Sequence, residues 1–254
     1  MTASPPTRPS DPRVLAVVPA RGGSRGLPDK NVRLLSGLPL VVHAIRAAAG
    51  VAAISRTVVT TDSTRIADVA REHGGDVPFL RPAGLAADDT PMAPVIAHAL
   101  ATVEEMEGSS YDAVVLLDPT SPAREPQQVT AALEMLWADP ALDGVVSVSE
   151  PTFQPEWVGV RHEGAALARY FPASAGVTRR QDTERYLRIN GNFYVWRAAS
   201  ARALSRSWFD EGRYGGLEIP EAQAFSIDDE DEFRLIQALV DAGVVRLPWT
   251  EEDR

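Results

Sequence analysis

The sequence predicts an α/β fold built on a doubly wound, mostly parallel β-sheet. Short apolar runs alternate along the chain with longer segments in which apolar residues recur at helical spacing, and this alternation is typical of such sheets. The runs at residues 14–18 and 113–117 are apolar at every position, as expected for strands that are buried on both faces. The length of 254 residues fits one large domain of this kind.

The individual elements follow in order from the N-terminus. Strands are expected at residues 14–18, 56–61, 77–80, 113–117, 144–148 and 192–196. Helices are expected at about residues 39–49, 63–73, 91–106, 125–137 and 229–241. Ser63 is a typical N-cap, Gly74 is typical of the position after a helix, and Pro91 suits the start of a helix. In the last helix three apolar residues share one face: Phe233, Ile236 and Val240.

Two segments fall outside this alternation. Residues 1–12 are rich in Pro, Ser and Thr and have no apolar core, so we expect a disordered leader rather than a secretory signal. Residues 13–254 are expected to form the single domain. Within it, residues 151–188 combine short strands, several prolines and a basic pair, which indicates an inserted arm rather than another βα unit.

Composition excludes several classes of function. The formal net charge of −10 disfavours a nucleic-acid partner, which would need a basic face, although a local cluster of cations could still bind a small anion. Cysteine is absent, so neither disulfides nor thiolate metal sites contribute. No apolar run reaches the roughly 20 residues that cross a bilayer, so we expect no membrane partner and a cytoplasmic location.

The segment with the clearest chemistry is PARGGSRGLPDKN at residues 19–31, which follows the first strand. Ligands of open α/β sheets bind at the carboxyl ends of the strands. Glycines at 22, 23 and 26 let backbone N–H groups approach phosphate oxygens closely. Arg21, Arg25 and Lys30 supply the positive charge that a triphosphate requires. The segment therefore predicts a phosphate-binding loop rather than a surface turn with incidental charges.

Other glycine-rich motifs fit this loop less well. A Walker loop needs Gly-Lys followed by Ser or Thr, and both that pattern and the dinucleotide pattern GxGxxG are absent here. The pattern GxSxG does occur, centred on Ser24, as in the nucleophile elbow of hydrolases. An elbow requires a helix directly after the serine, and Leu27-Pro28 disfavours one.

The same loop resembles the signature of the acylneuraminate cytidylyltransferase family, the CMP-sialic acid synthetases and their relatives. Later segments resemble further blocks of that family in the same order, through most of the chain: Val59-Thr-Thr-Asp62, Pro78-Phe-Leu-Arg-Pro82, Leu116-Leu-Asp-Pro-Thr-Ser-Pro122, Arg179-Arg-Gln-Asp182 and Asn190-Gly-Asn-Phe-Tyr194. The resemblance implies a fold like that of nucleotide-diphospho-sugar transferases. It also implies an enzyme that joins CTP and an acidic sugar into a CMP derivative and releases pyrophosphate.

The resemblance also implies roles for particular residues. Arg21 and Lys30 would hold the triphosphate, and Arg81 would help to recognise cytosine, unless it is a solvated loop residue. The expected nucleotide-binding set is Ala20, Arg21, Gly22, Gly23, Ser24, Arg25, Gly26, Lys30, Asn31 and Arg81. Because phosphoryl chemistry depends mainly on positioning and charge neutralisation, Arg21, Lys30 and Asp228 are the expected catalytic residues.

A divalent cation is expected at Asp228. The family ends in a block similar to Ser-Ile-Asp-Ile-Asp-Thr-Glu, whose two aspartates bind metal, whereas this chain has Ser-Ile-Asp-Asp-Glu-Asp-Glu at residues 226–232. Alignment on the following helix places Asp228 on the second aspartate and Ser226 on the first. Mg²⁺, or Mn²⁺ in its place, often takes one or two protein carboxylates, so Asp228 could suffice. The alternative is that the acidic residues only cap the helix.

The resemblance places the acid-binding site at Asp118, Thr120, Ser121, Asn190 and the arm residues Arg179, Arg180 and Gln181. In the family such an arm packs across a homodimer and completes the neighbouring subunit's sugar site, although solvated arginines would look the same. Many sialic acid synthetases carry glutamine where this chain has Asp118. This departure leaves the exact substrate open: a nonulosonic acid of the sialic type is expected first, and Kdo or another small acid such as a phosphonate follows. Asp118 is expected to meet sugar hydroxyls or a substrate amine, unless it only bonds nearby backbone N–H groups.

Two further functions remain open from the sequence. A sugar-1-phosphate nucleotidyltransferase shares the glycine-rich loop and the parallel sheet but forms a diphosphate linkage. A catalytically silent nucleotide-binding protein would also retain the loop, and Ser226 in place of a metal-binding aspartate leaves this reading possible.

Overall fold

A computed structural model describes residues 9–176, 179 and 184–251. Its centre is a six-stranded sheet in the order β10-β6-β9-β5-β1-β4. The strands are β1 (Val14–Pro19), β4 (Arg56–Thr60), β5 (Ala113–Leu116), β6 (Gly144–Ser149), β9 (Arg188–Arg197) and β10 (Tyr214–Glu218). All neighbours are parallel except β9, which runs antiparallel to both β5 and β6. The doubly wound, mostly parallel sheet predicted from the sequence is confirmed.

Helices cover both faces of this sheet. One face packs against α1 (Leu40–Ala49), α2 (Thr64–Glu72) and α4 (Pro126–Ala138), and the other against α3 (Met92–Glu107) and α6 (Ala198–Arg202). Alternate β1 side chains enter opposite cores, with Val18 in the first and Val17 in the second. Strand β1 is fully buried because both faces are covered, which explains its uninterrupted apolar sequence.

A third apolar cluster joins the C-terminal helices to the side of the molecule that carries residues 19–31, which we call the phosphate loop. Helices α8 (Glu230–Asp241) and α9 (Pro248–Glu251) pack with α1 and the small hairpin β2 (Leu34–Leu35)–β3 (Leu38–Pro39). Helix α8 begins in a capping box, in which Asp229 accepts from the Glu232 N–H at 2.9 Å and Glu232 accepts from the Asp229 N–H at 3.2 Å. This cap fixes the start of α8. It therefore also fixes where residues 226–228 pass, which is directly beside the loop that follows β1.

A buried histidine fastens the last helix to this cluster. Trp249 Nε1 donates to His43 Nδ1 at 2.9 Å, and His43 Nε2 lies 2.9 Å from the Leu35 carbonyl. The tryptophan can only donate, so the His43 proton lies on Nε2 and points to Leu35. Burial lowers the pKa of His43, which keeps the ring neutral in this role.

The structure differs from the expected elements in two places. Residues 77–80 form no strand, since only isolated bridges pair Asp76 with Val58 and Leu80 with Thr61. Pro78 lies between them and has no N–H for a continuous ladder. Strand β10 was not expected, because Gly215 and Gly216 weaken its strand signal. It pairs with β6, and a Cβ at Gly215 would lie only 2.9 Å from Met135 Sδ, so close packing explains that glycine.

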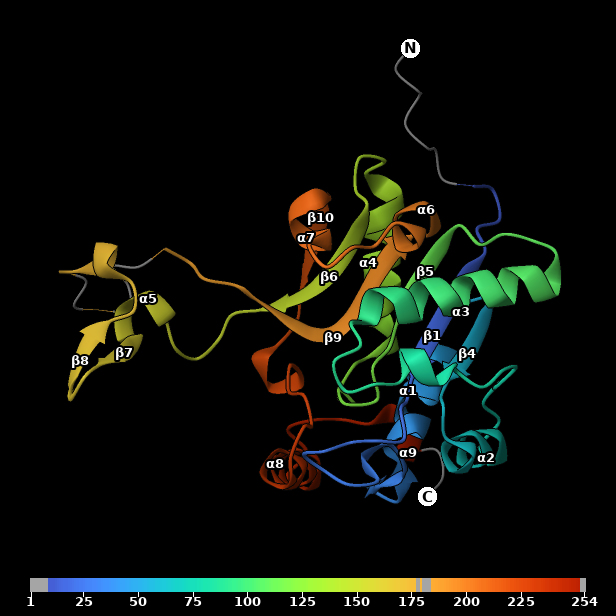
Figure 1. Ribbon diagram of the computed structural model, residues 1–254, viewed down its shortest axis with the longest axis horizontal. Coiled ribbons are helices and arrows are strands. Elements are labelled where there is room, and N and C mark those ends of the chain that lie inside the picture. The colour runs from blue at the N-terminus through green and yellow to red at the C-terminus, as the bar shows by residue number, and fades with distance from the viewer. Residues whose placement is uncertain (1–8, 177–178, 180–183, 252–254) are drawn as a thin grey trace, which may run out of the picture.

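The chain between β6 and β9 projects away from the sheet (Figure 1). It contains α5 (Pro155–Val158) and a hairpin of β7 (Val160–Glu163) and β8 (Ala166–Arg169), all four residues of β7 being exposed. Large apolar side chains of this projecting segment are exposed: Phe153, Trp157, Val160, Leu167, Tyr170 and Tyr186. Within the described residues, no helix combines the length and apolarity needed to cross a membrane.

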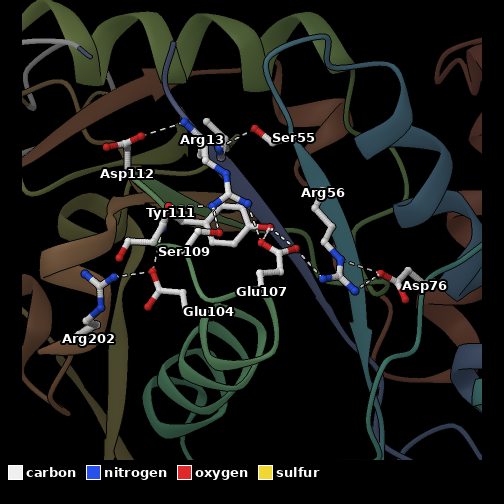
Figure 2. A network of polar contacts seen from close by, with 12 residues as sticks. Arg13, Ser55, Arg56, Asp76, Glu104, Glu107, Ser109, Tyr111, Asp112 and Arg202 are labelled. Carbon is white, nitrogen blue, oxygen red and sulfur yellow. Dashed lines mark hydrogen bonds and ion pairs between the residues drawn. The ribbon is translucent and has the colours of Figure 1, made fainter. Parts of the chain in front are cut away.

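A polar network ties together the amino ends of β1, β4 and β5, at the edge opposite the phosphate loop (Figure 2). At its centre Glu107 accepts from Arg13 at 2.5 Å, from Arg56 at 2.6 Å and from the Tyr111 hydroxyl at 3.0 Å. Burial and the adjacent Glu107 raise the pKa of Tyr111 to about 12. Burial works against ionisation of Glu107, but the hydrogen bonds from Arg56 and Arg13 outweigh it and lower its pKa.

We expect Glu107→Gln to lower the free energy of unfolding by about 2 kcal/mol at pH 7, because it leaves two partly buried arginines without their shared carboxylate. Since the pKa of Glu107 is lower in the folded state, its contribution is complete above the ordinary value of 4.5 and is lost as the pH falls through the folded value. Urea unfolding at several pH values measures both effects. The control is Asp68→Asn, which removes an exposed pair with Arg71 and should cost no more than about 0.5 kcal/mol. Equal losses in the two variants would contradict a central role for Glu107.

Candidate active site

Two adjoining cavities open at the carboxyl ends of β1 and β5. The first, of about 350 Å³, is lined by the phosphate loop and residues 226–228, and we call it the loop cavity. The second, of about 280 Å³, lies among β5, β9 and α3, and we call it the inner cavity. Both are lined by the same four residues, Met92, Asp118, Thr120 and Ser226, so the two cavities form one continuous cleft. This is the edge where open α/β sheets bind their ligands.

The phosphate loop is held in place by its neighbours. Asn31 is buried and donates through Nδ2 to the Arg21 carbonyl at 3.0 Å, while the Gly22 N–H donates to Asp62 Oδ1 at 2.9 Å. A Cβ added at Gly26 would overlap the carbonyl oxygen of Asp228. Only glycine therefore allows the loop to approach residues 226–228 this closely.

Lys30 joins the loop to the same segment. Its Nζ donates to the Ile227 carbonyl at 2.8 Å and to Asp228 Oδ1 at 2.9 Å, and its side chain is 11% exposed. Lys30 is the only lysine among the 25 basic residues Lys and Arg of the sequence. A lysine offers a compact, rotatable point charge where arginine offers a planar fork, and the two oxygens that Lys30 contacts suit the compact charge.

Two other cations line the loop cavity. Arg21 is paired with Asp88, which also pairs with Arg25, and hydrogen bonding to Arg21 lowers the pKa of Asp88. Arg81 is buried rather than solvated: its Nη2 donates to the Thr60 carbonyl at 2.5 Å and its backbone N–H donates to Thr61 O at 2.7 Å. Burial lowers the pKa of Arg81. With Lys30, these residues place three cations around one cavity.

Asp118 stands at the junction of the two cavities. It follows β5, as expected, and its Oδ1 accepts from the Thr120 N–H at 3.0 Å. The Asp118 carboxylate therefore both shapes the turn and lines the cleft. Thr120 and Ser121 line the inner cavity beside it, and the Thr120 carbonyl accepts from the Ile227 N–H at 2.8 Å.

Arg124 holds this turn from the interior of the protein, and we did not predict it from the sequence. It is completely buried, and it donates through Nη2 to the Asp118 carbonyl at 2.5 Å and through Nε to the Asn192 carbonyl at 2.9 Å. Burial lowers its pKa to about 10. An arginine two residues after Pro122, between a buried strand and the next helix, was the available signal.

Asn190 lines the inner cavity and is itself buried. Its Oδ1 accepts from Ser147 Oγ at 2.6 Å and from the Asn192 N–H at 3.1 Å, which leaves Nδ2 without a partner among the described residues. A buried amide that lacks a partner is costly, so Nδ2 provides a donor for a ligand. The inner cavity also has aromatic walls that sequence reasoning missed: Tyr194, Trp196 and Trp208.

The expected site residues are only partly brought together. The loop cavity is lined by Arg21, Ser24, Lys30, Asn31, Arg81, Asp118, Thr120 and Asp228, and the inner cavity adds Ser121 and Asn190. Ala20, Gly22, Gly23 and Gly26 belong to the loop but do not line these cavities, and the Arg25 side chain is 83% exposed. Arg179 lies in the projecting segment and lines neither cavity, while Arg180 and Gln181 fall outside the described residues.

The hydrolase interpretation of Ser24 finds no support in the loop's conformation. After Ser24 the chain makes bends and turns before the short 3₁₀ segment Lys30–Val32, so no helix starts at the serine.

A divalent cation bound at Asp228 would have few ligands from the protein. Among the described residues no group of three or more His, Asp or Glu side chains could hold a metal ion. Asp228 is exposed at the mouth of the loop cavity, where Lys30 binds one carboxylate oxygen and Ser226 Oγ donates to the other at 3.2 Å. Helix capping falls to Asp229, so the Asp228 carboxylate has no structural role in α8. One carboxylate combined with phosphate oxygens fits the coordination habits of Mg²⁺.

Comparison with known proteins agrees with this geometry. A family described as Cytidylyltransferase matches residues 15–208. A CMP-N,N'-diacetyllegionaminic acid synthase of Legionella pneumophila is 34% identical over 237 residues, which cover 90% of this chain and 97% of that protein. An N-acylneuraminate cytidylyltransferase of Escherichia coli O18:K1:H7 is also 34% identical, over 88% of this chain and 51% of that longer protein.

A solved structure shares the fold. The structure of a CMP:2-keto-3-deoxy-manno-octonic acid synthetase complexed with CTP superimposes with a TM-score of 0.68 at 20% identity, covering 91% of this chain and 99% of the other. At that identity the likeness shows the nucleotidyltransferase-like fold and does not identify a substrate.

Proposed function

Because this chain belongs to the cytidylyltransferase family, a family of CTP-dependent nucleotidyltransferases, we propose that it transfers CMP from CTP to a nonulosonic acid of the sialic type and releases pyrophosphate. The observation that carries the proposal is the continuous cleft. Three cations surround the loop cavity, which suits a triphosphate, and the inner cavity offers the polar groups that a sugar acid needs. Asp118 and Thr120 lie where the two substrates would meet.

In the proposed reaction the anomeric hydroxyl of the acid attacks the α-phosphorus of CTP, an O–P bond forms, the bond to pyrophosphate breaks, and the hydroxyl proton is released to solvent. Lys30 and Arg21 bind the phosphate oxygens and stabilise the charge that moves onto the leaving group. To do so, Arg21 exchanges its pair with Asp88 for the triphosphate. Asn31 holds the loop that carries both cations, Arg81 lies at the nucleotide side of the cleft, and Asp118 accepts a hydrogen bond from a hydroxyl of the acid.

We propose Mg²⁺ as the cofactor, held by Asp228 together with phosphate oxygens, where it would neutralise phosphate charge. Asp228→Asn is expected to raise the metal concentration at half-maximal activity by about tenfold, because an amide oxygen is a weaker ligand for a hard cation than a carboxylate. Titration of Mg²⁺ and of Mn²⁺ against both proteins measures the shift. Asp229→Asn, which keeps an N-cap residue on α8, is the matched control and should leave the titration unchanged. Identical half-saturation for Asp228→Asn and wild type would remove Asp228 from the metal site.

We also propose a homodimer formed through the projecting segment between β6 and β9. The support is its unusual apolar exposure, with Leu167 63% and Tyr170 60% exposed, together with the arm of the family that the sequence resembles. Arg179 of one subunit would then reach its partner's acid site. Light scattering with Leu167→Glu and wild type measures the assembly, and a wild type that is monomeric and fully active at assay concentration would refute it. We place the reaction in the cytoplasm, where CTP is available.

A pyrophosphate-release assay tests the proposed function. CTP, UTP, GTP and dTTP are each combined with N-acetylneuraminate, N,N'-diacetyllegionaminate, 3-deoxy-manno-octulosonate and a small phosphonate. We expect release only with CTP and a nonulosonic acid, and a product that carries one phosphate. Consumption of a sugar 1-phosphate with a diphosphate product would instead indicate a sugar-1-phosphate nucleotidyltransferase. Calorimetric binding of CTP without release of pyrophosphate would indicate a silent nucleotide-binding protein.

A further inference from the structure

The inner cavity has two chemically different ends. The end it shares with the loop cavity is mostly polar, with Asp118, Thr120 and Ser226 beside Met92, and the inner cavity has two further polar lining residues, Ser121 and Asn190. The other end, which we call the apolar end, is lined by six side chains that do not reach the loop cavity: Ile96, Leu116, Tyr194, Trp196, Leu204 and Trp208. The apolar end therefore lies outside the stretch of the cleft that the two cavities share.

Hydrogen-bonding groups are scarce at the apolar end. Three of its six side chains carry one: Tyr194, Trp196 and Trp208. The Tyr194 hydroxyl lies near Gly191, where an added Cβ would be 3.8 Å away, so it points toward the polar stretch that contains Asn190. The pyrrole edge of Trp196 packs toward β6, since a Cβ at Gly144 would lie 2.9 Å from its Cδ1. The Trp208 indole adds one N–H donor and no acceptor, so a ligand group placed here meets mainly carbon and finds, among these six side chains, no acceptor for a hydroxyl proton beyond the Tyr194 oxygen.

Trp208 closes this end and is held there by other rings. It lies edge-on to Tyr194 at 5.7 Å, to Trp196 at 5.9 Å and to Tyr214 at 4.8 Å between ring centroids. Such edge-to-face contacts are favourable and fix the orientation of an aromatic side chain. Trp208 starts the short helix α7 (Trp208–Glu211), and Leu204 precedes it in the same connection between β9 and β10.

The reaction fixes which end of the acid lies here. The anomeric carbon must meet the α-phosphate, so it faces the polar end beside the loop cavity. The far side of the pyranose, which carries the exocyclic tail on C6 and the neighbouring substituent on C5, then points toward the apolar end. A tail rich in hydroxyls would leave them unpaired, whereas a methyl terminus or the methyl of an N-acyl group would bury apolar surface.

We propose that Leu204 and Trp208 determine specificity, and that they select acids whose tail ends in deoxy or N-acyl groups over acids with a polyhydroxyl tail. This inference rests on the proposed function. A hydrophobic pocket discriminates by about tenfold to a hundredfold for one such group. We therefore expect wild type to use N,N'-diacetyllegionaminate, which carries a methyl terminus and a second N-acetyl group, at least about tenfold better in kcat/KM than N-acetylneuraminate, whose tail carries three hydroxyls.

Substitutions at the cavity wall test the proposal. Leu204 and Trp208 are partly exposed and also border an outer groove, so replacing either should not disturb a closed core. Leu204→Asn, which adds a hydrogen-bonding group, is expected to lower the ratio of the two kcat/KM values about tenfold while the KM for CTP stays unchanged. Trp208→Leu is expected to lower the same ratio of kcat/KM values. Leu34→Asn is the control, since it makes the same change at a position that is 58% exposed and lines neither the inner cavity nor the outer groove.

Acid binding measured without CTP separates this inference from the proposed function. Tryptophan fluorescence reports the site directly, because Trp196 and Trp208 line it. Preferential binding of the methyl-terminated acid, weakened in Leu204→Asn, would support the apolar end even if no acid released pyrophosphate and the proposed function failed. Equal binding and equal kcat/KM for the two acids in wild type would overturn the proposal. An unchanged ratio in folded Leu204→Asn and Trp208→Leu would also overturn it.

Discussion

Lys30→Ala is expected to lower kcat for pyrophosphate release at least about 100-fold, because one preorganised contact to the charge of the transition state commonly contributes that much. The Lys30 ammonium lies in the loop cavity, where it donates to the Ile227 carbonyl and to the Asp228 carboxylate. It is therefore positioned before the nucleotide arrives. Steady-state kinetics with saturating CTP and acid measure the loss.

Lys30→Arg separates charge from geometry. Arginine keeps the positive charge but brings a planar fork into a space where the lysine side chain is 11% exposed, so we expect it to restore only a small part of the activity. Circular dichroism and thermal melting show whether both variants fold. Near-normal turnover of folded Lys30→Ala would remove Lys30 from the mechanism.

The single lysine offers an independent measurement. Apart from the N-terminus, Lys30 is the only amine that an amine-selective reagent can modify. If Lys30 contacts the triphosphate, CTP should protect it from acetylation, as measured by mass spectrometry of the peptide that contains it. Modification at the same rate with and without CTP would place the nucleotide elsewhere.

Much of the fold could be predicted from the sequence because local patterns determine it. The apolar runs at 14–18 and 113–117 became the central strands β1 and β5, and the predicted helix N-cap at Ser63 accepts from the Ile66 N–H at 3.4 Å. The phosphate loop could be recognised because its glycines and cations are adjacent in the sequence. Strand β10 could not, since its two glycines are there for packing against neighbouring elements rather than for strand propensity.

The parts of the site that depend on distant contacts could not be predicted. Asp88 pairs with the loop arginines from 63 residues or more away in the chain, and no local pattern indicates this. The same holds for Trp208, which reaches the inner cavity only because β9 and β10 bring their connection back beside α3. Asp228 was expected at the site, but its bond to Lys30 spans 198 positions and follows from the packing of α8.

Gly26→Ala is expected to lower kcat/KM for CTP by about 100-fold, although it adds a single methyl group. A Cβ at this position would overlap the Asp228 carbonyl oxygen, and that atom is backbone and cannot rotate away. Either the phosphate loop or residues 226–228 must move, and Lys30, which bonds to both Ile227 and Asp228, moves with them. Displacement of catalytic groups by about 1 Å can cost a hundredfold in rate.

Gly23→Ala in the same loop distinguishes displacement from a general effect of alanine. A Cβ there would meet only the Arg21 side chain, at 3.9 Å, and Gly23 does not have a positive φ. We therefore expect Gly23→Ala to keep or slightly raise the melting temperature, because alanine restricts the unfolded chain, and Gly26→Ala to lower it through steric strain. Any loss of activity in Gly23→Ala would then report obstruction of the phosphates rather than a displaced loop. If Gly26→Ala melts and turns over like wild type, the close approach of the loop to Asp228 is not what positions Lys30, and its place in the cleft must come from the bond between Asn31 and the Arg21 carbonyl instead.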